Sequence, residues 1–177
     1  FIVEGSIDKP YANYGESQKN IHLVIGLIKG KRMDMAIEKS VEFGVKSIHP
    51  VLFERSIKKT LNPERLTKVI VSSAKQTGRS IFPELKKPVK FLEWIEAYQD
   101  RNCFACHFEA KSKIENVVSS QTDDIMIIVG PEGDFSANEI ALLKKYETPL
   151  VNLGPRRLRS ESACISAIIT ASNIIEG

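Results

Sequence analysis

One stretch of this 177-residue chain decides its fold: Ile125-Met126-Ile127-Ile128-Val129-Gly130-Pro131-Glu132-Gly133-Asp134-Phe135-Ser136. Its start, Ile125–Val129, is wholly apolar, which predicts a strand buried on both faces. The residues Gly130–Gly133 predict a tight loop, and a helical pattern begins after Ser136. Such strand–loop–helix units build parallel α/β sheets, which bind ligands at the carboxyl ends of their strands. Gly130–Gly133 is therefore a candidate binding loop that carries one carboxylate, Glu132.

A second loop of the same kind follows the next predicted strand, Pro149–Leu153. It reads Gly154-Pro155-Arg156-Arg157-Leu158-Arg159-Ser160. Neither loop contains a P-loop or a G-x-G-x-x-G sequence, so we do not expect a nucleoside triphosphate or dinucleotide site of those types. The loops suit a ligand such as an adenine edge, bound by backbone N–H and C=O groups. Three side chains are expected to form apolar walls around it: Ile128, Leu153 and Leu158.

Strand-like and helix-like segments alternate along the rest of the chain. Strands are predicted at Ile21–Ile28, Val45–Phe53, Asn102–Phe108, Ile125–Val129 and Pro149–Leu153. Helices are predicted around residues 33–41, from Pro63 onward, at Phe91–Tyr98, after Ser136 and after Ser160. This alternation predicts an α/β fold with a mainly parallel sheet. The last helix is apolar on nearly every side, so we expect it to be buried in the core or against a partner.

The sequence also marks where several of these helices begin. Asn62 stands directly before a proline, which is the pattern of an N-cap followed by the first helical residue. Ser136 and Glu139 have the spacing of a capping box, which gives Glu139 a structural role. Ser160 is expected to cap the last helix. Glu132 has no such structural explanation, so it is the better candidate for chemistry.

Charge gives weak support to a polyanionic partner, since the net charge is only +3. Its arrangement is more informative. Arg156, Arg157 and Arg159 lie beside the predicted N-terminus of the last helix, which itself carries partial positive charge. A phosphate-bearing partner is therefore expected there, the alternative being a solvated basic turn. Arg79 also has two interpretations, an RNA contact or a cation that complements the end of its helix.

The cysteines do not suggest a disulfide framework, because there are three of them, which favours a cytoplasmic protein. Cys103–His107 has the C-x-x-C-H spacing of c-type haem attachment, but it lies in a strand pattern and no export signal is visible. A zinc site is not expected, because cysteines and histidines are widely scattered. Two interpretations stay open: half-buried thiols in a strand, or a third ligand loop beginning at Cys106-His107. No apolar run reaches the roughly 18 residues that span a bilayer.

Several segments together resemble the bacterial 16S ribosomal RNA uridine-N3 methyltransferases of the SPOUT class. The resemblance covers about residues 21–177. The segments that carry it are Lys29–Met33, Glu38–Val45, Ile48–Pro50 with Glu54–Ser56, Gln76–Arg79 with Pro83, and the two loops at 130–140 and 153–163. Each segment alone is a weak signal, but their order and spacing make a strong one.

The resemblance implies an enzyme that uses S-adenosylmethionine (SAM) to methylate N3 of a uridine in 16S ribosomal RNA of the small subunit. It implies a SPOUT methyltransferase domain at residues 21–177, with a C-terminal trefoil knot and a homodimer packed through the knotted region. Family members begin with a PUA-like β-barrel that binds RNA. Residues 1–20 are expected to be a remnant of that domain and a linker, the alternative being a frayed terminus. Since the chain begins at Phe1 without Met, we expect its natural start to be missing.

With this resemblance, we expect the loops to carry the site. Arg159 and Glu132 are the catalytic candidates. Arg159 would favour the uridine anion or hold a phosphate, and Glu132 would accept the N3 proton or orient the base. The candidates for cofactor binding are Cys106, His107, Gly130, Pro131, Glu132, Gly133, Leu153, Gly154, Arg157 and Leu158. The candidates for RNA binding are Arg32, Arg79 and Arg156, and no metal is expected.

The chain departs from the family pattern at four positions. Asp134 stands where the family usually has glycine, Arg157 where it has an aliphatic residue, and Ser160 and Ser162 where it has threonines. Asp134 and Arg157 either pair across the two loops or alter the affinity for the cofactor. They also motivate one alternative function, an RNA-binding module that has lost its cofactor. The other alternative is a SPOUT methyltransferase that acts on transfer RNA or on another ribosomal position.

Overall fold

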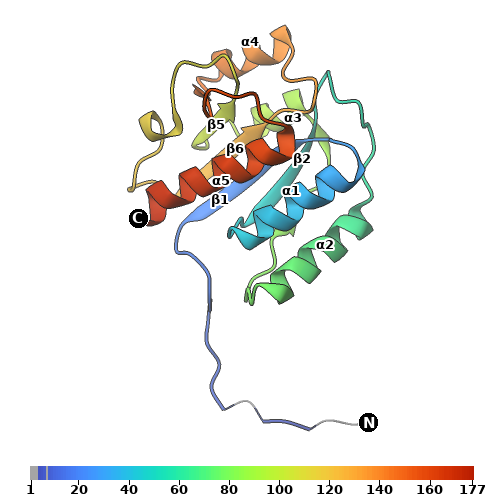
Figure 1. Ribbon diagram of the computed structural model, residues 1–177, viewed down its shortest axis with the longest axis vertical. Coiled ribbons are helices and arrows are strands. Elements are labelled where there is room, and N and C mark those ends of the chain that lie inside the picture. Colours follow the sequence, from blue (N-terminus) through green and yellow to red (C-terminus); the bar gives the residue numbers. More distant parts are fainter. Residues whose placement is uncertain (1–3, 7) are drawn as a thin grey trace.

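The structure, a computed structural model, describes residues 4–6 and 8–177. The expected remnant of an N-terminal domain, residues 1–20, lies partly outside the described residues. The N-terminal end of the described chain runs away from the rest of the molecule (Figure 1), whereas Glu16, shortly before the first strand, is held to it by ion pairs. None of the described helices is both long enough and apolar enough to cross a membrane.

The described strands form one parallel sheet, which confirms the predicted α/β class. Its order is β3-β2-β1-β6-β5-β7, with β4 also pairing with β2, and every pairing between named strands is parallel. The strands are β1 (Asn20–Gly26), β2 (Ser47–Leu52), β3 (Glu84–Leu85), β4 (Val89–Lys90), β5 (Cys103–Cys106), β6 (Asp124–Val129) and β7 (Leu150–Val151). Parallel pairing brings the carboxyl ends of these strands to the same edge of the sheet. The trefoil knot stays a prediction.

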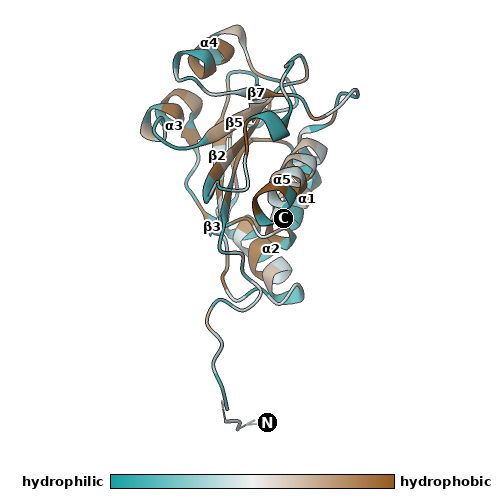
Figure 2. Cartoon of the chain, turned by 90° about the vertical axis from the view of Figure 1, so that its left-hand side faces the viewer, coloured by the Kyte–Doolittle hydropathy of each residue, from teal (hydrophilic) through white to brown (hydrophobic). Residues whose placement is uncertain are grey.

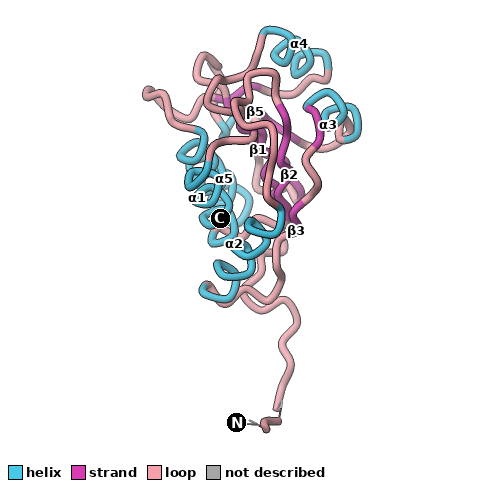
Figure 3. Tube along the Cα trace, turned by 90° about the vertical axis from the view of Figure 1, so that its right-hand side faces the viewer, coloured by secondary structure: helices cyan, strands magenta, loops and turns pink. Residues whose placement is uncertain are grey.

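Helices cover both faces of the sheet. They are α1 (Gly30–Glu42), α2 (Pro63–Gln76), α3 (Phe91–Ala97), α4 (Ala137–Lys145) and α5 (Ser160–Glu176), with a 3₁₀ turn η1 (Ile114–Asn116). The helices α1, α2 and α5 lie on one face, and α3 and α4 lie on the other (Figures 1 and 2). Loops connect the elements at the two ends of the strands (Figure 3). The result is a three-layer α/β/α arrangement, as the alternation of the sequence predicts.

Side chains of β6 alternate between the two halves of the core. Ile127 packs in the cluster shared with α1, α2 and α5, whereas Ile128 packs in the cluster shared with α3 and α4. Both side chains are fully buried. Because successive side chains of a strand point to opposite faces, an all-apolar strand is what a sheet covered on both faces requires.

The predicted starts of two helices are confirmed. The Asn62 side chain accepts a hydrogen bond from Arg65 N at the start of α2. Ser136 and Glu139 form both bonds of a capping box at the start of α4. The second carboxylate oxygen of Glu139 accepts a hydrogen bond from Glu54 N, so this buried side chain is fully used by the fold.

The predicted cap of α5 is wrong by one residue. Arg159 is the N-cap, and Ser160 is the first helical residue, with no side-chain capping bond. The first helical hydrogen bond runs from Ala163 N to Arg159 O, at 2.8 Å. Arg159 therefore stands at the junction of loop and helix, with its backbone in an extended conformation.

The loop after β6 rests directly on the end of β1. A Cβ atom on Gly26 would lie 2.6 Å from Pro131 N and 2.9 Å from Pro131 Cα. These are backbone atoms or atoms of the ring, so no side-chain rotation relieves the overlap. The absence of a side chain at Gly26 is thus what allows the candidate loop Gly130–Gly133 to lie where it does.

Replacing Gly26 with alanine is expected to lower the free energy of unfolding by roughly 1–3 kcal/mol, because overpacking displaces backbone. Chemical denaturation measures the change. Gly5→Ala is the control, since a Cβ at Gly5 meets no atom within 4 Å. Equal stability of the Gly26 variant and the control would contradict this packing.

A buried ion pair anchors the segment before β1. Glu16 Oε2 lies 2.7 Å from Arg79 Nη2 and 2.8 Å from Lys46 Nζ, and the side chains of Glu16 and Arg79 are only 2% and 4% exposed. Burial alone would raise the pKa of Glu16, but hydrogen bonds from Arg79, Lys46 and Ile81 N outweigh it and lower the pKa to about 2. The Arg79 guanidinium also donates to the carbonyl oxygens of Val41 and Val45.

Glu16→Gln is expected to destabilise the protein by about 3 kcal/mol, because it leaves the buried Arg79 without its counter-charge. The pH dependence follows from the same pair. The pKa of Glu16 is about 2 when folded against an ordinary 4.5, so its contribution is present above pH 4.5 and is lost as the pH falls towards 2. Unfolding curves between pH 6 and pH 2 should show a steeper loss for the wild type than for Glu16→Gln. Parallel curves would count against the pair.

Candidate functional site

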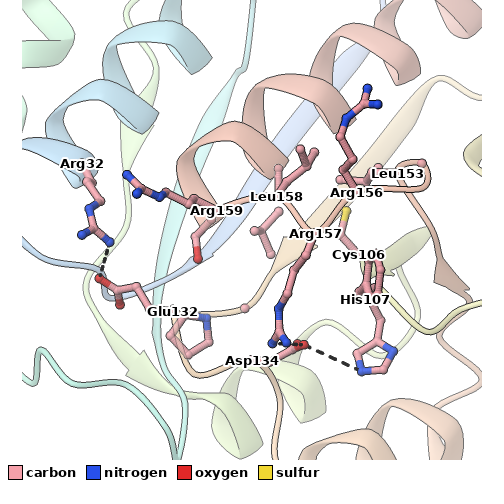
Figure 4. A pocket seen from close by; sticks show the side chains of 17 residues that line it. Arg32, Cys106, His107, Glu132, Asp134, Leu153, Arg156, Arg157, Leu158 and Arg159 are labelled. Atoms are coloured by element: carbon pink, nitrogen blue, oxygen red, sulfur yellow. Dashed lines mark hydrogen bonds and ion pairs between the residues drawn. The ribbon is translucent and has the colours of Figure 1, made fainter.

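Three parallel strands end around one cavity. β5 pairs with β6 on one side and with β7 on the other, so the loops that follow these strands are neighbours. A cavity of about 310 Å³ lies among them (Figure 4). Its walls are formed by Arg32, Cys106, His107, Phe108, Val129, Gly130, Pro131, Glu132, Asp134, Leu153, Gly154, Arg156, Arg157, Leu158, Arg159, Ser160 and Ala163.

The cavity gathers most of the residues that the sequence singled out. Among the ten candidates for cofactor binding, the only one absent from its walls is Gly133. A Cβ at Gly133 would lie 2.8 Å from Arg55 Cβ, and Gly133 O accepts a hydrogen bond from Arg55 Nη1. This glycine therefore packs against Arg55 and not against the cavity.

The apolar wall from β6 differs from the expected one. Ile128 does not line the cavity, and Val129 does. Ile128 points to the opposite face of the sheet, among the side chains of α3 and α4. The wholly apolar strand gave no sign of which residue faces which side, because both faces are buried.

Cys106 and His107 bring the end of β5 into the cavity, together with Phe108. This arrangement favours the third-loop interpretation of the segment. Burial raises the pKa of the Cys106 thiol well above its ordinary value, so the thiol is neutral and serves as an apolar wall. All three cysteines are free, and the described part of the chain holds no group of three or more potential metal ligands.

Glu132 has one used and one unused carboxylate oxygen. Its Oε1 accepts a hydrogen bond from Lys29 N at 3.2 Å and lies 3.7 Å from Arg32 Nη1. Its Oε2 is buried and has no hydrogen-bond partner among the described residues. A buried carboxylate oxygen without a partner is costly, so this atom is suited to accept a hydrogen bond from a ligand.

The arginines predicted to bind RNA or to act in catalysis lie in two places, at the cavity and elsewhere in the fold. Arg32, Arg156 and Arg159 all line the cavity and are exposed to solvent. In the view of Figure 4, Arg32 and Arg159 lie on the same side of the cavity as Glu132. Arg79 is far from this arrangement, since its guanidinium is buried against Glu16 and two backbone carbonyls. The expectation that Arg79 contacts RNA is thus replaced by a structural role.

The two departures from the family pattern meet across the cavity. Arg157 Nη2 lies 3.5 Å from Asp134 Oδ2, and His107 Nε2 lies 4.0 Å from the same oxygen (Figure 4). Asp134 has a φ of +61°, a left-handed conformation that aspartate tolerates, and its Oδ1 accepts a hydrogen bond from Phe135 N. Asp134 therefore stabilises the turn at a position where the family usually has glycine. Because its side chain lies near His107 and Arg157, it also links the loops after β5, β6 and β7.

One buried acidic residue was not anticipated. Glu161, in the first turn of α5, is only 6% exposed, and its Oε2 has no hydrogen-bond partner among the described residues. In sequence it is an ordinary acidic residue at a helix N-terminus, where it complements the helix dipole. Nothing in that pattern distinguishes a buried carboxylate from an exposed one.

A family model described as an RNA methyltransferase domain matches residues 15–172 of this sequence. The chain belongs to the RNA methyltransferase domain family. Among curated relatives, the ribosomal RNA small subunit methyltransferase E of Buchnera aphidicola is 36% identical over 160 residues, which are 86% of this chain and 63% of the relative. The protein of the same name from Rickettsia conorii is 30% identical over 165 residues, which are 92% of this chain and 66% of the relative.

Solved structures agree with the family. A Legionella pneumophila protein determined with bound SAM superposes with a TM-score of 0.83 at 34% identity, covering 90% of this chain and 68% of that chain. The ribosomal RNA small subunit methyltransferase E of Neisseria gonorrhoeae, bound to S-adenosyl methionine, has a TM-score of 0.81 at 28% identity, with the same coverage. The resemblance found in the sequence is therefore confirmed for the family and the fold. This chain spans slightly less than two thirds of the length of the first two relatives.

The pair of Asp134 and Arg157 is expected to be a weak link, because the Arg157 side chain is 67% exposed. A double-mutant cycle with Asp134→Asn and Arg157→Gln should give a coupling energy below about 1 kcal/mol. Asparagine is chosen because it accepts a left-handed conformation. The coupling should fall in 1 M salt, where the Debye length is about 3 Å. A coupling that salt leaves unchanged would show that the two residues interact through packing instead.

Proposed function

We propose that this chain is a SAM-dependent methyltransferase that modifies N3 of a uridine in 16S ribosomal RNA of the small subunit. One observation carries the proposal: three strand ends of a family-typical sheet surround a cavity that contains nearly all residues expected to bind the cofactor. Two structurally similar proteins were determined with SAM bound, which supports this choice of ligand.

The residues of the cavity fit this cofactor. Val129, Leu153 and Leu158 offer apolar surface for an adenine ring. Gly154 has a φ of +125° and no atom within 4 Å of a Cβ position, which leaves room for a ligand to approach the backbone. The adenine nucleoside of the cofactor therefore matches these surfaces. Oε2 of Glu132, which has no partner among the described residues, is left as an acceptor for the reacting base.

When bound, the cofactor supplies an electrophilic methyl group. The protein has to hold the acceptor nitrogen in line with that group, and positioning alone provides much of the rate. We assign Glu132 Oε2 as the atom that accepts the hydrogen bond, or the proton, of the uridine N3–H. General-base catalysis of this kind raises the reaction rate about 10²–10⁴-fold. Arg159, at the junction of the loop and α5, stabilises the negative charge that develops as the proton leaves.

RNA contacts follow from the remaining cations. Arg32 and Arg156 stand on the walls of the cavity and suit phosphates on either side of the target uridine. The uridine has to leave its base stack to present N3. The proposal includes a homodimer packed through α5 and a site of action in the cytoplasm, on the small ribosomal subunit.

Arg159→Ala is expected to lower turnover on unmodified small subunits by roughly 10²-fold or more, because it removes a charge that acts mainly in the transition state. Calorimetry with S-adenosylhomocysteine should show nearly unchanged affinity. Arg101→Ala is the matched control, since Arg101 lies before β5, at the opposite end of that strand. Wild-type turnover in the Arg159 variant would reject the assigned role.

Two measurements separate this proposal from its alternatives. A silent calorimetric titration of the wild type with S-adenosylhomocysteine would favour an RNA-binding module without a cofactor. Nucleoside analysis of RNA from a deletion strain identifies the target. Loss of N3-methyluridine from 16S ribosomal RNA supports the proposal, and loss of another methylated nucleoside supports a different RNA substrate.

A further inference from the structure

A second cavity, of about 260 Å³, lies beyond the carboxyl end of β1. It is surrounded by residues that follow β1, by the first turn of α1, and by the loop before α2 with the first turn of that helix. The helices α1 and α2 pack side by side (Figure 1), and the residues that line the cavity include Gly30 and Met33 of α1 and Arg65 and Leu66 of α2. Neither the proposed methyl transfer nor the binding of the cofactor uses it.

The floor of this cavity is apolar and closely packed. It consists of Leu27, Ile28, Met33 and Leu66, each at most 2% exposed. All four belong to the main hydrophobic cluster of the domain. Such a floor has no hydrogen-bonding groups, so it suits the face of a base whose polar edges turn to the rim.

The rim of the cavity is polar and positive. Lys58 is exposed and makes no ion pair among the described residues. Arg65 is held in place by Asp34, with 2.9 Å between Nη2 and Oδ1. Asn62 uses its side-chain oxygen to cap α2, which leaves its NH₂ group as a donor. An apolar floor beneath a cation and neutral donors matches a nucleobase joined to a phosphate.

The two cavities are separated by a single helical turn. Gly30 and Met33 line the second cavity, whereas Arg32, between them in sequence, lines the first. Lys29, the N-cap residue directly before this turn, donates a backbone hydrogen bond to Glu132 and so ties the start of α1 to the first cavity. A single strand that crosses the turn can therefore place one nucleotide on each side of it.

We infer that the second cavity, here named the flanking pocket, binds a nucleotide next to the methylated uridine in the RNA substrate. The base lies on the floor of Leu27, Ile28, Met33 and Leu66, and Lys58 binds its phosphate. Sequence-specific recognition of RNA uses unstacked bases held in such pockets, while phosphate contacts set the register. The inference rests on the proposed function, because RNA is its ligand. It adds a second point of contact, which holds N3 of the target uridine in line with the methyl group of the cofactor.

Methyl NMR spectra of the chain test the flanking pocket directly. The protein is first saturated with S-adenosylhomocysteine, which should shift the methyl signals of Val129 and Leu158 in the first cavity. Uridine monophosphate is then added. We expect it to shift the methyl signals of Leu27, Ile28 and Leu66, whereas inorganic phosphate at equal concentration should not.

Two adjacent lysines provide a matched pair of variants. Lys58 and Lys59 are both exposed, but only Lys58 lines the pocket. Lys58→Glu should weaken uridine monophosphate binding by roughly tenfold, the value of a charge-assisted hydrogen bond. Lys59→Glu should have a much smaller effect, since the same charge change occurs outside the pocket. Both variants should retain the wild-type spectrum without ligand.

The outcomes for the flanking pocket and for the proposed function are distinguishable. No shift of the three floor methyl signals, equal effects of the two variants, or the same shifts with phosphate alone would each overturn the flanking pocket. No response of Val129 and Leu158 to S-adenosylhomocysteine would instead count against the methyltransferase, whatever uridine monophosphate does.

Discussion

The parallel pairing of β5 with both β6 and β7 is the constraint on which the site depends. Parallel strands end at one edge, so three loops that are distant in sequence converge there. The close approach of Gly26 to Pro131 then fixes how near the loop that follows β6 lies to the end of β1. The cavity is therefore a consequence of strand order and of one missing side chain.

The charges of the site follow a simple division. Cations on the loops and on the first turn of α1 remain exposed, whereas Oε2 of Glu132 is buried and has no hydrogen-bond partner among the described residues. Exposed cations attract a polyanion over a distance set by the salt concentration. A buried acceptor acts only on a group that enters the cavity. In the proposed function, the exposed cations attract RNA and the buried acceptor orients the reacting base.

Local signals in the sequence predicted much of this structure. The apolar strand β6, the capping box of Ser136 and Glu139, and the cap at Asn62 depend on residues close in sequence, and all three are confirmed. The convergence of the loops was predicted from the rule for parallel sheets. The prediction that Ile128 forms a wall of the cavity was wrong, and Val129 forms it instead. A strand that is buried on both faces has no alternation of apolar and polar residues, so its sequence does not show which side chain faces which side.

These local signals do not predict contacts between residues that are far apart in the sequence. Arg79 had two interpretations, an RNA contact or a cation at the end of its helix, and neither names its buried partner Glu16. The two residues are 63 positions apart in sequence, and only the fold brings them together. Similarly, the flanking pocket is lined by residues of both α1 and α2, whose packing no single segment specifies. The pairing of Asp134 with Arg157 was one of two interpretations, and the geometry of the loops supports it.

The most direct test of the central claim is a crystal structure of this chain with S-adenosylhomocysteine. The account predicts the ligand between the loops that follow β5, β6 and β7, with its adenine against Val129, Leu153 and Leu158. It also predicts that Glu132 Oε2 makes no bond to this ligand and stays open to the uridine, with an ordered water as its partner. A ligand bound elsewhere, or a cavity that stays closed by Asp134 and Arg157 at saturating ligand, would contradict it.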